Sequence, residues 1–261
     1  MSFVLARVVA VAAFAALVAG STVAASGSQL RDGRTASGYS LALNGTSAYV
    51  SVPDSKSLQL ERTNAFTVAL RVRLDSYSNN VLPRFWEKGP QYLCIMGDPT
   101  NGRFREIGLE VQNASGAGNS NGGATEFWGS TKVATGRWYF IAVTFDASLK
   151  SNQAQIYVDG APEKMATIYP WSGKLFATAG KPWMIGRRTN DLARQLDGRI
   201  DWMLVYPTAL GAKQVAALSN GQSVPGAVAD WGFDEGGGTV ADDSSGHGNS
   251  GSIVNGVFVA N

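Results

Sequence analysis

Short runs of alternating apolar and polar residues dominate the chain after about residue 38. The segment FTVALRVRLDS, residues 66–76, places Phe, Val, Leu, Val and Leu at every second position, with Thr and two Arg among the intervening residues. This period of two predicts a strand with one buried face and one charged face. Similar patterns predict strands at 39–45, 48–53, 84–89, 91–98, 105–112, 137–146, 153–160, 181–188 and 198–208.

A single segment has helical spacing instead. In ALGAKQVAALSNG, residues 209–221, the apolar residues Ala209, Leu210, Val215 and Leu218 recur with a helical period. Thr208 is the expected N-cap, and Asn220-Gly221 is the expected end. Many short strands with one helix predict an all-β fold, a two-sheet antiparallel jelly-roll sandwich with one short helix.

The N-terminus has the pattern of an export signal. Arg7 precedes an apolar run from Val8 to Gly20, and the small residues STVAAS follow it. This pattern predicts a signal peptide over residues 1–25, cleaved near Ala24 or Ala25, and therefore a secreted protein without a membrane span in its mature chain. An uncleaved N-terminal anchor is the alternative, although the apolar run is short for a bilayer.

Charge and rare residues exclude several classes of function. The chain has 22 Lys and Arg against 20 Asp and Glu, and it lacks a basic stripe that would bind nucleic acid. Cys94 is the only cysteine, so the chain has no intrachain disulfide, and with one histidine a zinc site of nitrogen and sulfur ligands is excluded. His247 lies in a Gly/Ser stretch, which favours an exposed loop residue over a catalytic base.

An ordered series of segments resembles a known family. SLALNGTSAYVSVPDSKSL, FTVALRVRLDS, GRWYFIAVTFDAS, QIYVDG, MIGRR and LDGRIDWMLVYPTALGAKQVAAL together resemble the LamG-like jelly-roll domains of the concanavalin A-like lectin/glucanase superfamily. The resemblance covers nearly everything after Gly38. It implies two curved antiparallel sheets, a concave face that holds glycans in some members, and often a structural Ca²⁺.

One segment of this pattern comes last instead of first. Segments like ADWGFDEGGGTVADDSSGHGNSGSIVNG, residues 229–256 here, usually precede the LALNGTSAYVSVP-like strand in such domains. We therefore expect residues 26–261 to form one LamG-like sandwich in circularly permuted order, with residues 227–261 adding strands beside Tyr39–Leu43. The alternative is a truncated second repeat, which would leave unpaired sheet edges.

The acidic loop in this last segment is a candidate calcium site. Ca²⁺ prefers carboxylate, carbonyl and water oxygens, and the family resemblance also implies this ion. The expected ligands are Asp242, Asp243 and Asn249, joined by Asn44 and by Asp201 or Asp197 if the permuted pairing is right. The alternative is a turn in which Asp and Asn side chains cap the backbone.

The hypothesis that the protein is an enzyme rests on the segment REIGLEV, residues 105–111. Glu106 and Glu110 lie four apart on one strand and so on the same face, about 13 Å apart by strand rise. This exceeds the separation of a retaining carboxylate pair. The stretch faintly resembles the E-I-D-x-E strand of laminarinase-like glycoside hydrolases, but Gly108 stands where that pattern has Asp. We therefore expect no catalytic residues, with Glu106 and Glu110 as weak candidates for a hydrolase or lyase.

Aromatic residues are the stronger functional signal, because sugar rings stack on indole and phenol groups. Trp86, Tyr92, Trp128 and Trp171 lie near turns or polar residues and are the candidates for glycan contact, whereas Trp138, Trp183, Trp202 and Trp231 are expected in the core. Arg187 and Arg188 are candidates for binding acidic sugars. The sequence thus predicts a non-catalytic, lectin-like module for a glycan or glycosylated surface; a polysaccharide-degrading enzyme and a protein-contacting adhesion module are the alternatives.

Overall fold

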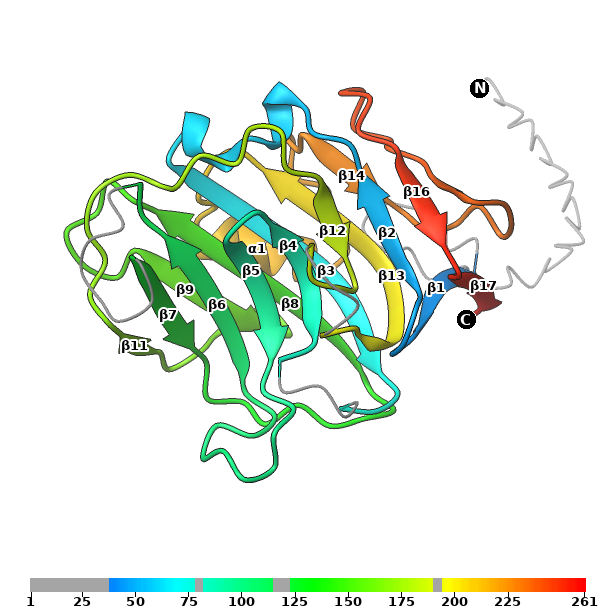
Figure 1. Cartoon of the computed structure of the whole chain (residues 1–261), viewed down its shortest axis with the longest axis horizontal. Coiled ribbons are helices and arrows are strands. Elements are labelled where there is room, and N and C mark those ends of the chain that lie inside the picture. The colour runs from blue at the N-terminus through cyan, green and yellow to red at the C-terminus, as the bar shows by residue number, and fades with distance from the viewer. Residues whose placement is uncertain (1–37, 78–81, 115–122, 190–193) are drawn as a thin grey trace, which may run out of the picture.

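Two antiparallel sheets stack face to face in the computed structural model of the chain (Figure 1). The structure describes residues 38–77, 82–114, 123–189 and 194–261. The predicted signal peptide, residues 1–25, lies outside these ranges. Within them the predicted all-β, jelly-roll-type sandwich with one short helix is confirmed.

The first sheet has eight strands in the described ranges. In spatial order they are β10 (Ala161–Pro162), β9 (Ala154–Val158), β8 (Trp138–Asp146), β3 (Ala65–Leu74), β13 (Asp197–Tyr206), β1 (Tyr39–Asn44) and β17 (Val257–Ala260), while β14 (Ala229–Trp231) also pairs with β13.

The second sheet has nine strands in the described ranges. Their order is β11 (Ala166–Ile168), β7 (Ala124–Trp128), β6 (Ile107–Gln112), β5 (Gln91–Ile95), β4 (Arg84–Lys88), β12 (Trp183–Ile185), β2 (Tyr49–Val52), β16 (Gly251–Val254) and β15 (Val240–Ala241). The 3-10 helices η1 (Lys56–Leu58) and η2 (Leu60–Arg62) follow β2.

The core lies between the sheets and follows the alternation in the sequence. Every second residue of β3, from Phe66 to Leu74, is buried in the main apolar cluster, whereas Arg71 and Arg73 point to the opposite face and are partly exposed. Aromatic rings link the two sheets, because Phe66 of β3 packs edge-on against Trp86 of β4. Burial of these apolar faces is the main force that holds the sandwich together.

The C-terminal residues 227–261, which we call the tail, contribute strands to both sheets. β17 pairs with β1 over Tyr39–Ala42, and β16 pairs with β2 over Tyr49–Ser51 (Figure 1). β14 pairs with β13 over Met203–Val205, beyond the part of β13 that β1 occupies. The expected pairing of the tail beside Tyr39 is therefore present. The backbone N–H of Asn261 donates to the carbonyl of Gly38, so residues 38 and 261 are neighbours.

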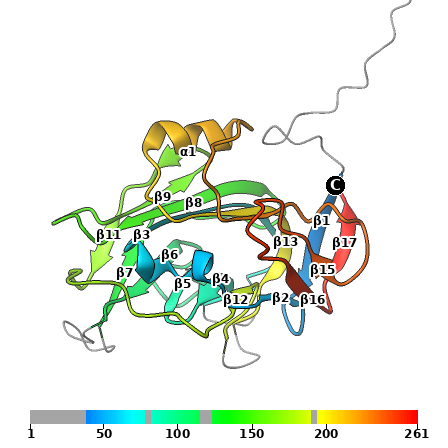
Figure 2. The same cartoon turned by 90° about the horizontal axis from the view of Figure 1, so that it is seen from above.

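The helix α1 (Ala212–Ser219) covers the outer face of the eight-stranded sheet (Figure 2). Its Val215 and Leu218 are buried in a second apolar cluster with Trp202 and Tyr206 of β13. The expected cap at Thr208 is wrong.

The helix begins three residues later than that cap would require, with Gly211 as the N-cap, and the Gln214 side chain accepts the Gly211 N–H. The hydroxyl of Thr67 instead donates to the carbonyl of Thr208, and this bond joins the segment before the helix to β3. Among the described residues, no helix is long and apolar enough to cross a membrane.

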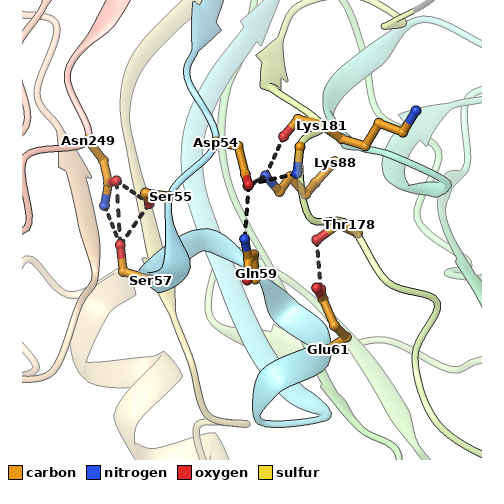
Figure 3. A network of polar contacts seen from close by, with 10 residues as sticks. Asp54, Ser55, Ser57, Gln59, Glu61, Lys88, Thr178, Lys181 and Asn249 are labelled. Carbon is orange, nitrogen blue, oxygen red and sulfur yellow. Dashed lines mark hydrogen bonds and ion pairs between the residues drawn. The ribbon is translucent and has the colours of Figure 1, made fainter.

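A buried lysine fixes the loops at one end of the nine-stranded sheet. Lys88, at the end of β4, donates to the Asp54 carboxylate and to the carbonyl of Lys181 (Figure 3). Asp54 also accepts the side-chain amide of Gln59 and the backbone N–H of Gly180. The loop after β2 and the loop before β12 are thus held together through one side chain.

Candidate functional site

A groove of about 560 Å³ opens on the outer face of the nine-stranded sheet, the face that points away from the core. In β6, Ile107, Leu109 and Val111 are in the core, so Glu110 and Gln112 point to the other side, into the groove. The groove is lined by Arg84, Glu87, Gly89, Pro90, Tyr92, Glu110, Gln112, Phe176, Lys181, Arg188, Thr189 and Arg194.

The floor of the groove is built around Tyr92. The hydroxyl of Tyr92, on β5, donates to the Oε2 of Glu110 on β6 at 2.5 Å. The guanidinium carbon of Arg84 lies 3.3 Å from the centre of the Tyr92 ring. Burial raises the pKa of the Tyr92 phenol, and burial together with the nearby Glu126 raises the pKa of the Glu110 carboxyl. Tyr92 therefore keeps its proton and acts as a hydrogen-bond donor at neutral pH.

Arg84 holds the wall of the groove in place. Its side chain is buried and forms an ion pair with Glu87 through Nε at 3.2 Å. The other oxygen of Glu87 accepts the backbone N–H of Thr189 at 2.8 Å, and the Arg84 N–H donates to the carbonyl of Arg194. Strand β4 thus fixes both ends of the segment that carries Arg188 and Arg194.

The two predicted arginines separate in the structure. Arg188 lines the groove, whereas the guanidinium of Arg187 lies 4.3 Å from the centre of the Tyr49 ring on β2, away from the groove residues. Arg187 is therefore not part of this site. Arg187 lies in the bend that follows β12, and its Nε donates to the carbonyl of Arg188 at 2.8 Å.

The expected exposure of the tryptophans is wrong in all three cases. Trp86 is fully buried and stacks on Trp183 with ring centres 4.9 Å apart, and Trp171 is buried edge-on against Phe145. Trp128 is 4 % exposed and belongs to a small apolar cluster on the outer face. Of the predicted aromatic contacts, the groove therefore includes Tyr92 alone.

The other four tryptophans follow the expectation with one exception. Trp183, Trp202 and Trp231 are buried. Trp138 is only partly buried, and the Arg71 guanidinium lies 4.6 Å from its ring centre.

Glu106 and Glu110 do not form a carboxylate pair. Glu106 pairs with Lys132 at 2.8 Å and with Arg103 at 3.2 Å, while Glu110 accepts from Tyr92. The Trp128 indole fills the space over Gly108 between them, where an added Cβ would lie 2.6 Å from its ring. The position at which the hydrolase pattern has Asp is therefore occupied by an aromatic ring.

The expected calcium ligands lie in three separate places. Asp243 and Asn249 lie near Ser55 and Ser57, beyond the C-terminal end of β2, whereas Asn44 precedes the N-terminal end of that strand. Asp201 forms an ion pair with Arg71 at 2.7 Å on the other sheet. The expectation that the acidic bend lies beside Asn44 is wrong, because β16 runs antiparallel to β2 and carries the bend to its opposite end.

The oxygens of these residues already accept hydrogen bonds. The Asp243 carboxylate accepts the backbone N–H groups of Asp230, Ser245 and Asn249, and the Asn44 amide oxygen accepts those of residues 46–48. Asn249 accepts from Ser55, and Asp242 is exposed. In the described part of the chain, no three acidic, histidine or cysteine side chains form a metal-binding group. The fold therefore does not gather the named residues around one ion, and calcium binding stays a prediction from the resemblance.

Sequence reasoning missed most of the groove. Arg84, Glu87, Phe176 and Arg194 come from one strand and two loops, and only the fold brings them together. The charged residues that flank Phe85 and Trp86 in the strand RFWEK are a local signal that could have indicated Arg84 and Glu87, because buried charges need partners.

Known structures with the same fold are distant in sequence. A proposed carbohydrate-binding protein from Bacteroides ovatus aligns with a TM-score of 0.65 and 16% identity over 85% of this chain, which spans 60% of that structure's length. A heptameric SAP-like pentraxin from Limulus polyphemus has a TM-score of 0.49 at 12% identity, covering 86% of this chain and 92% of its own.

The binding domain of botulinum neurotoxin serotype G has a TM-score of 0.47 at 14% identity, covering 69% of this chain and 41% of its own. No curated protein sequence matches the chain. The Laminin_G_3 family model, described as the concanavalin A-like lectin/glucanases superfamily, matches residues 44–216. The chain therefore belongs to the concanavalin A-like lectin/glucanase superfamily.

Proposed function

We propose that this protein is an exported, non-catalytic carbohydrate-binding module that holds a glycan in the groove. The observation that carries the proposal is the groove itself, in which aromatic rings and polar side chains converge on one open face. The similarity in fold to a proposed carbohydrate-binding protein agrees with this function.

The groove residues match the chemistry of a sugar. Phe176 is 41% exposed at the groove and offers an aromatic surface for the flat C–H face of a pyranose ring. Gln112, Arg188 and Thr189 provide amide, guanidinium and hydroxyl groups to bond sugar hydroxyls. Export is supported by the signal-peptide pattern of residues 1–25.

A glycan array of the purified protein, with and without EGTA, tests the proposal. We expect binding to a subset of glycans and about a tenfold or greater loss in Phe176→Ala, because removal of a stacked ring weakens binding by more than 1 kcal/mol. Leu149→Ala is the matched control, since Leu149 is an exposed apolar residue outside the groove. The proposal would be contradicted if the protein bound none of the glycans, or if Phe176→Ala and Leu149→Ala bound them equally well.

Glycoside hydrolysis is the second candidate, and one observation favours it. Glu110 of β6 and Glu126 of β7 are directly opposed cross-strand partners, so their carboxylates share one face of the sheet. However, Glu110 accepts from Tyr92 and Glu126 accepts from the Trp128 indole at 2.9 Å. Both carboxylates thus have structural partners.

A reducing-end release assay on every glycan that binds separates the two functions. We expect no product from the unaltered protein. Product that disappears in both Glu110→Gln and Glu126→Gln would establish the hydrolase and overturn the non-catalytic proposal.

A further inference from the structure

Among the described residues that line the groove, positive charges outnumber negative charges. Arg84, Arg188, Arg194 and Lys181 line it, against Glu87 and Glu110. The three arginines come from β4 and from the residues after β12, and the backbone N–H of Arg84 donates to the carbonyl of Arg194, which joins the two parts of the chain. Because Glu87 already pairs with Arg84, an added anion would act mainly on the guanidinium group of Arg194.

The carboxylates of Glu87 and Glu110 already accept hydrogen bonds from other groups of the protein. One oxygen of Glu87 bonds Arg84 and the other accepts the Thr189 N–H, while Glu110 accepts from Tyr92. The Nη1 atom of Arg194 is buried without a hydrogen-bond partner. A buried guanidinium nitrogen without an acceptor is unfavourable, and an oxygen atom from a bound ligand would correct this.

The charges around Arg194 also favour a bound anion. Burial, followed by the charges of Arg84 and Arg188, lowers the pKa of its guanidinium. A negative group in the groove would relieve this repulsion.

Resting on the proposed function, we infer that the groove recognises an acidic glycan, through a carboxylate or sulfate group bound between Arg188 and Arg194 beside Tyr92. A guanidinium presents two parallel N–H donors that match both oxyanions, and such charge-assisted pairs are stronger than neutral hydrogen bonds. The exposed ring of Phe176 then lies on the same groove to contact the sugar.

Isothermal titration with three probes tests the inference: oligogalacturonate for carboxylate, carrageenan oligosaccharide for sulfate, and cello-oligosaccharide as the neutral probe. We expect one acidic probe to bind at least about tenfold more tightly than the neutral one, and the better acidic probe identifies the anionic group. The measurement on the unaltered protein does not depend on any variant folding correctly.

Arg188→Gln and Arg194→Gln should each weaken the acidic probe by about tenfold or more. Arg187→Gln is the matched control, because it removes the same charge from the neighbouring residue outside the groove, and its affinity should stay within about twofold. An equal loss in all three variants would mean non-specific attraction and would overturn the inference.

Two results distinguish this inference from the function on which it rests. Tight binding of the neutral probe, lost in Phe176→Ala and unchanged in the arginine variants, would refute acidic recognition while leaving glycan binding in place. Failure of all probes and of the glycan array would refute both.

Discussion

At the scale of single residues, the ion pair of Lys88 and Asp54 is the most consequential polar contact near the groove. The Lys88 side chain is fully buried, so burial lowers the pKa of its ammonium group, although Asp54 opposes this. Burial alone would raise the pKa of Asp54, but bonds from Lys88, the Gly180 N–H and Gln59 hold it below its usual value. Loss of one partner leaves a charge in the core.

Asp54→Asn should therefore lower the free energy of unfolding by about 3 kcal/mol at neutral pH, measured by urea denaturation. Asp75→Asn is the control, because Asp75 forms a partly exposed surface pair with Arg73 that contributes less than about 1 kcal/mol. Equal losses in the two variants would contradict the special role of the buried pair.

The same contact predicts a dependence on acid. A carboxyl group with a lowered folded-state pKa stabilises the fold above its unfolded pKa of about 3.9, and this contribution is lost as pH falls through the folded value. The difference in stability between the unaltered protein and Asp54→Asn should shrink below about pH 4. A constant difference down to pH 2 would show that Asp54 does not titrate in this way.

Gly108 stands at the position where the hydrolase-like pattern has Asp. Because an added Cβ would lie 2.6 Å from the Trp128 ring, Gly108→Ala should lower stability by about 1–3 kcal/mol and change the tryptophan fluorescence. Gly102→Ala is the control, since no atom lies within 4 Å of its added Cβ. A neutral Gly108→Ala would mean that Trp128 moves freely.

At the scale of elements, the loop of residues 242–249 is closed by hydrogen bonds to Asp243. Asp243→Ala removes an acceptor for three backbone N–H groups and should lower stability by about 1–3 kcal/mol. The exposed neighbour Asp242→Ala should change it by less than about 0.5 kcal/mol.

EGTA should leave the melting temperature of the unaltered protein unchanged, because the Asp243 carboxylate oxygens already accept hydrogen bonds from the backbone. A calcium-dependent rise in the melting temperature, lost in both Asp243→Ala and Asp242→Ala, would instead show that this loop binds the ion.

The strands could be predicted from the sequence, but the groove could not. The alternating pattern predicts β3 correctly because one face of this strand packs in the core and the other does not. It fails in β4, where the register shifts between Arg84 and Trp86 and both Phe85 and Trp86 turn inward. Trp86 was a candidate for glycan contact because polar residues lie beside it in the sequence, and this irregularity helps to place it in the core.

The groove depends on contacts between distant segments. Arg194 is held at the groove by the backbone hydrogen bond from Arg84 to its carbonyl. Phe176 comes from the long connection before β12. No periodic pattern marks either residue. Their role follows only from the sheet order, which brings β4, β5 and β6 together beneath those loops.

At the scale of the whole molecule, the neighbouring positions of residues 38 and 261 allow a test of the permuted order. A chain that begins at Gly226, joins Asn261 to Gly38 through a short glycine linker and ends at Pro225 keeps every strand intact. Its melting temperature should lie within about 4 °C of that of residues 38–261, which corresponds to about 1 kcal/mol.

The control opens the chain inside β8, between Ala142 and Val143, where both neighbouring strands pair. This second chain should not fold. If the chain opened at Gly226 also failed to fold, the tail could not serve as the first segment of the sandwich.

The only thiol of the chain lies under the groove. Cys94 is buried in a cluster with Met96 and Trp128, against which the groove residue Tyr92 packs, and burial raises the pKa of its thiol to about 12. A disulfide reagent such as Ellman's can therefore modify the protein only when this part of the sheet opens. The rate of this reaction therefore reports how often the sheet opens locally, and a sugar that occupies the groove should slow the reaction.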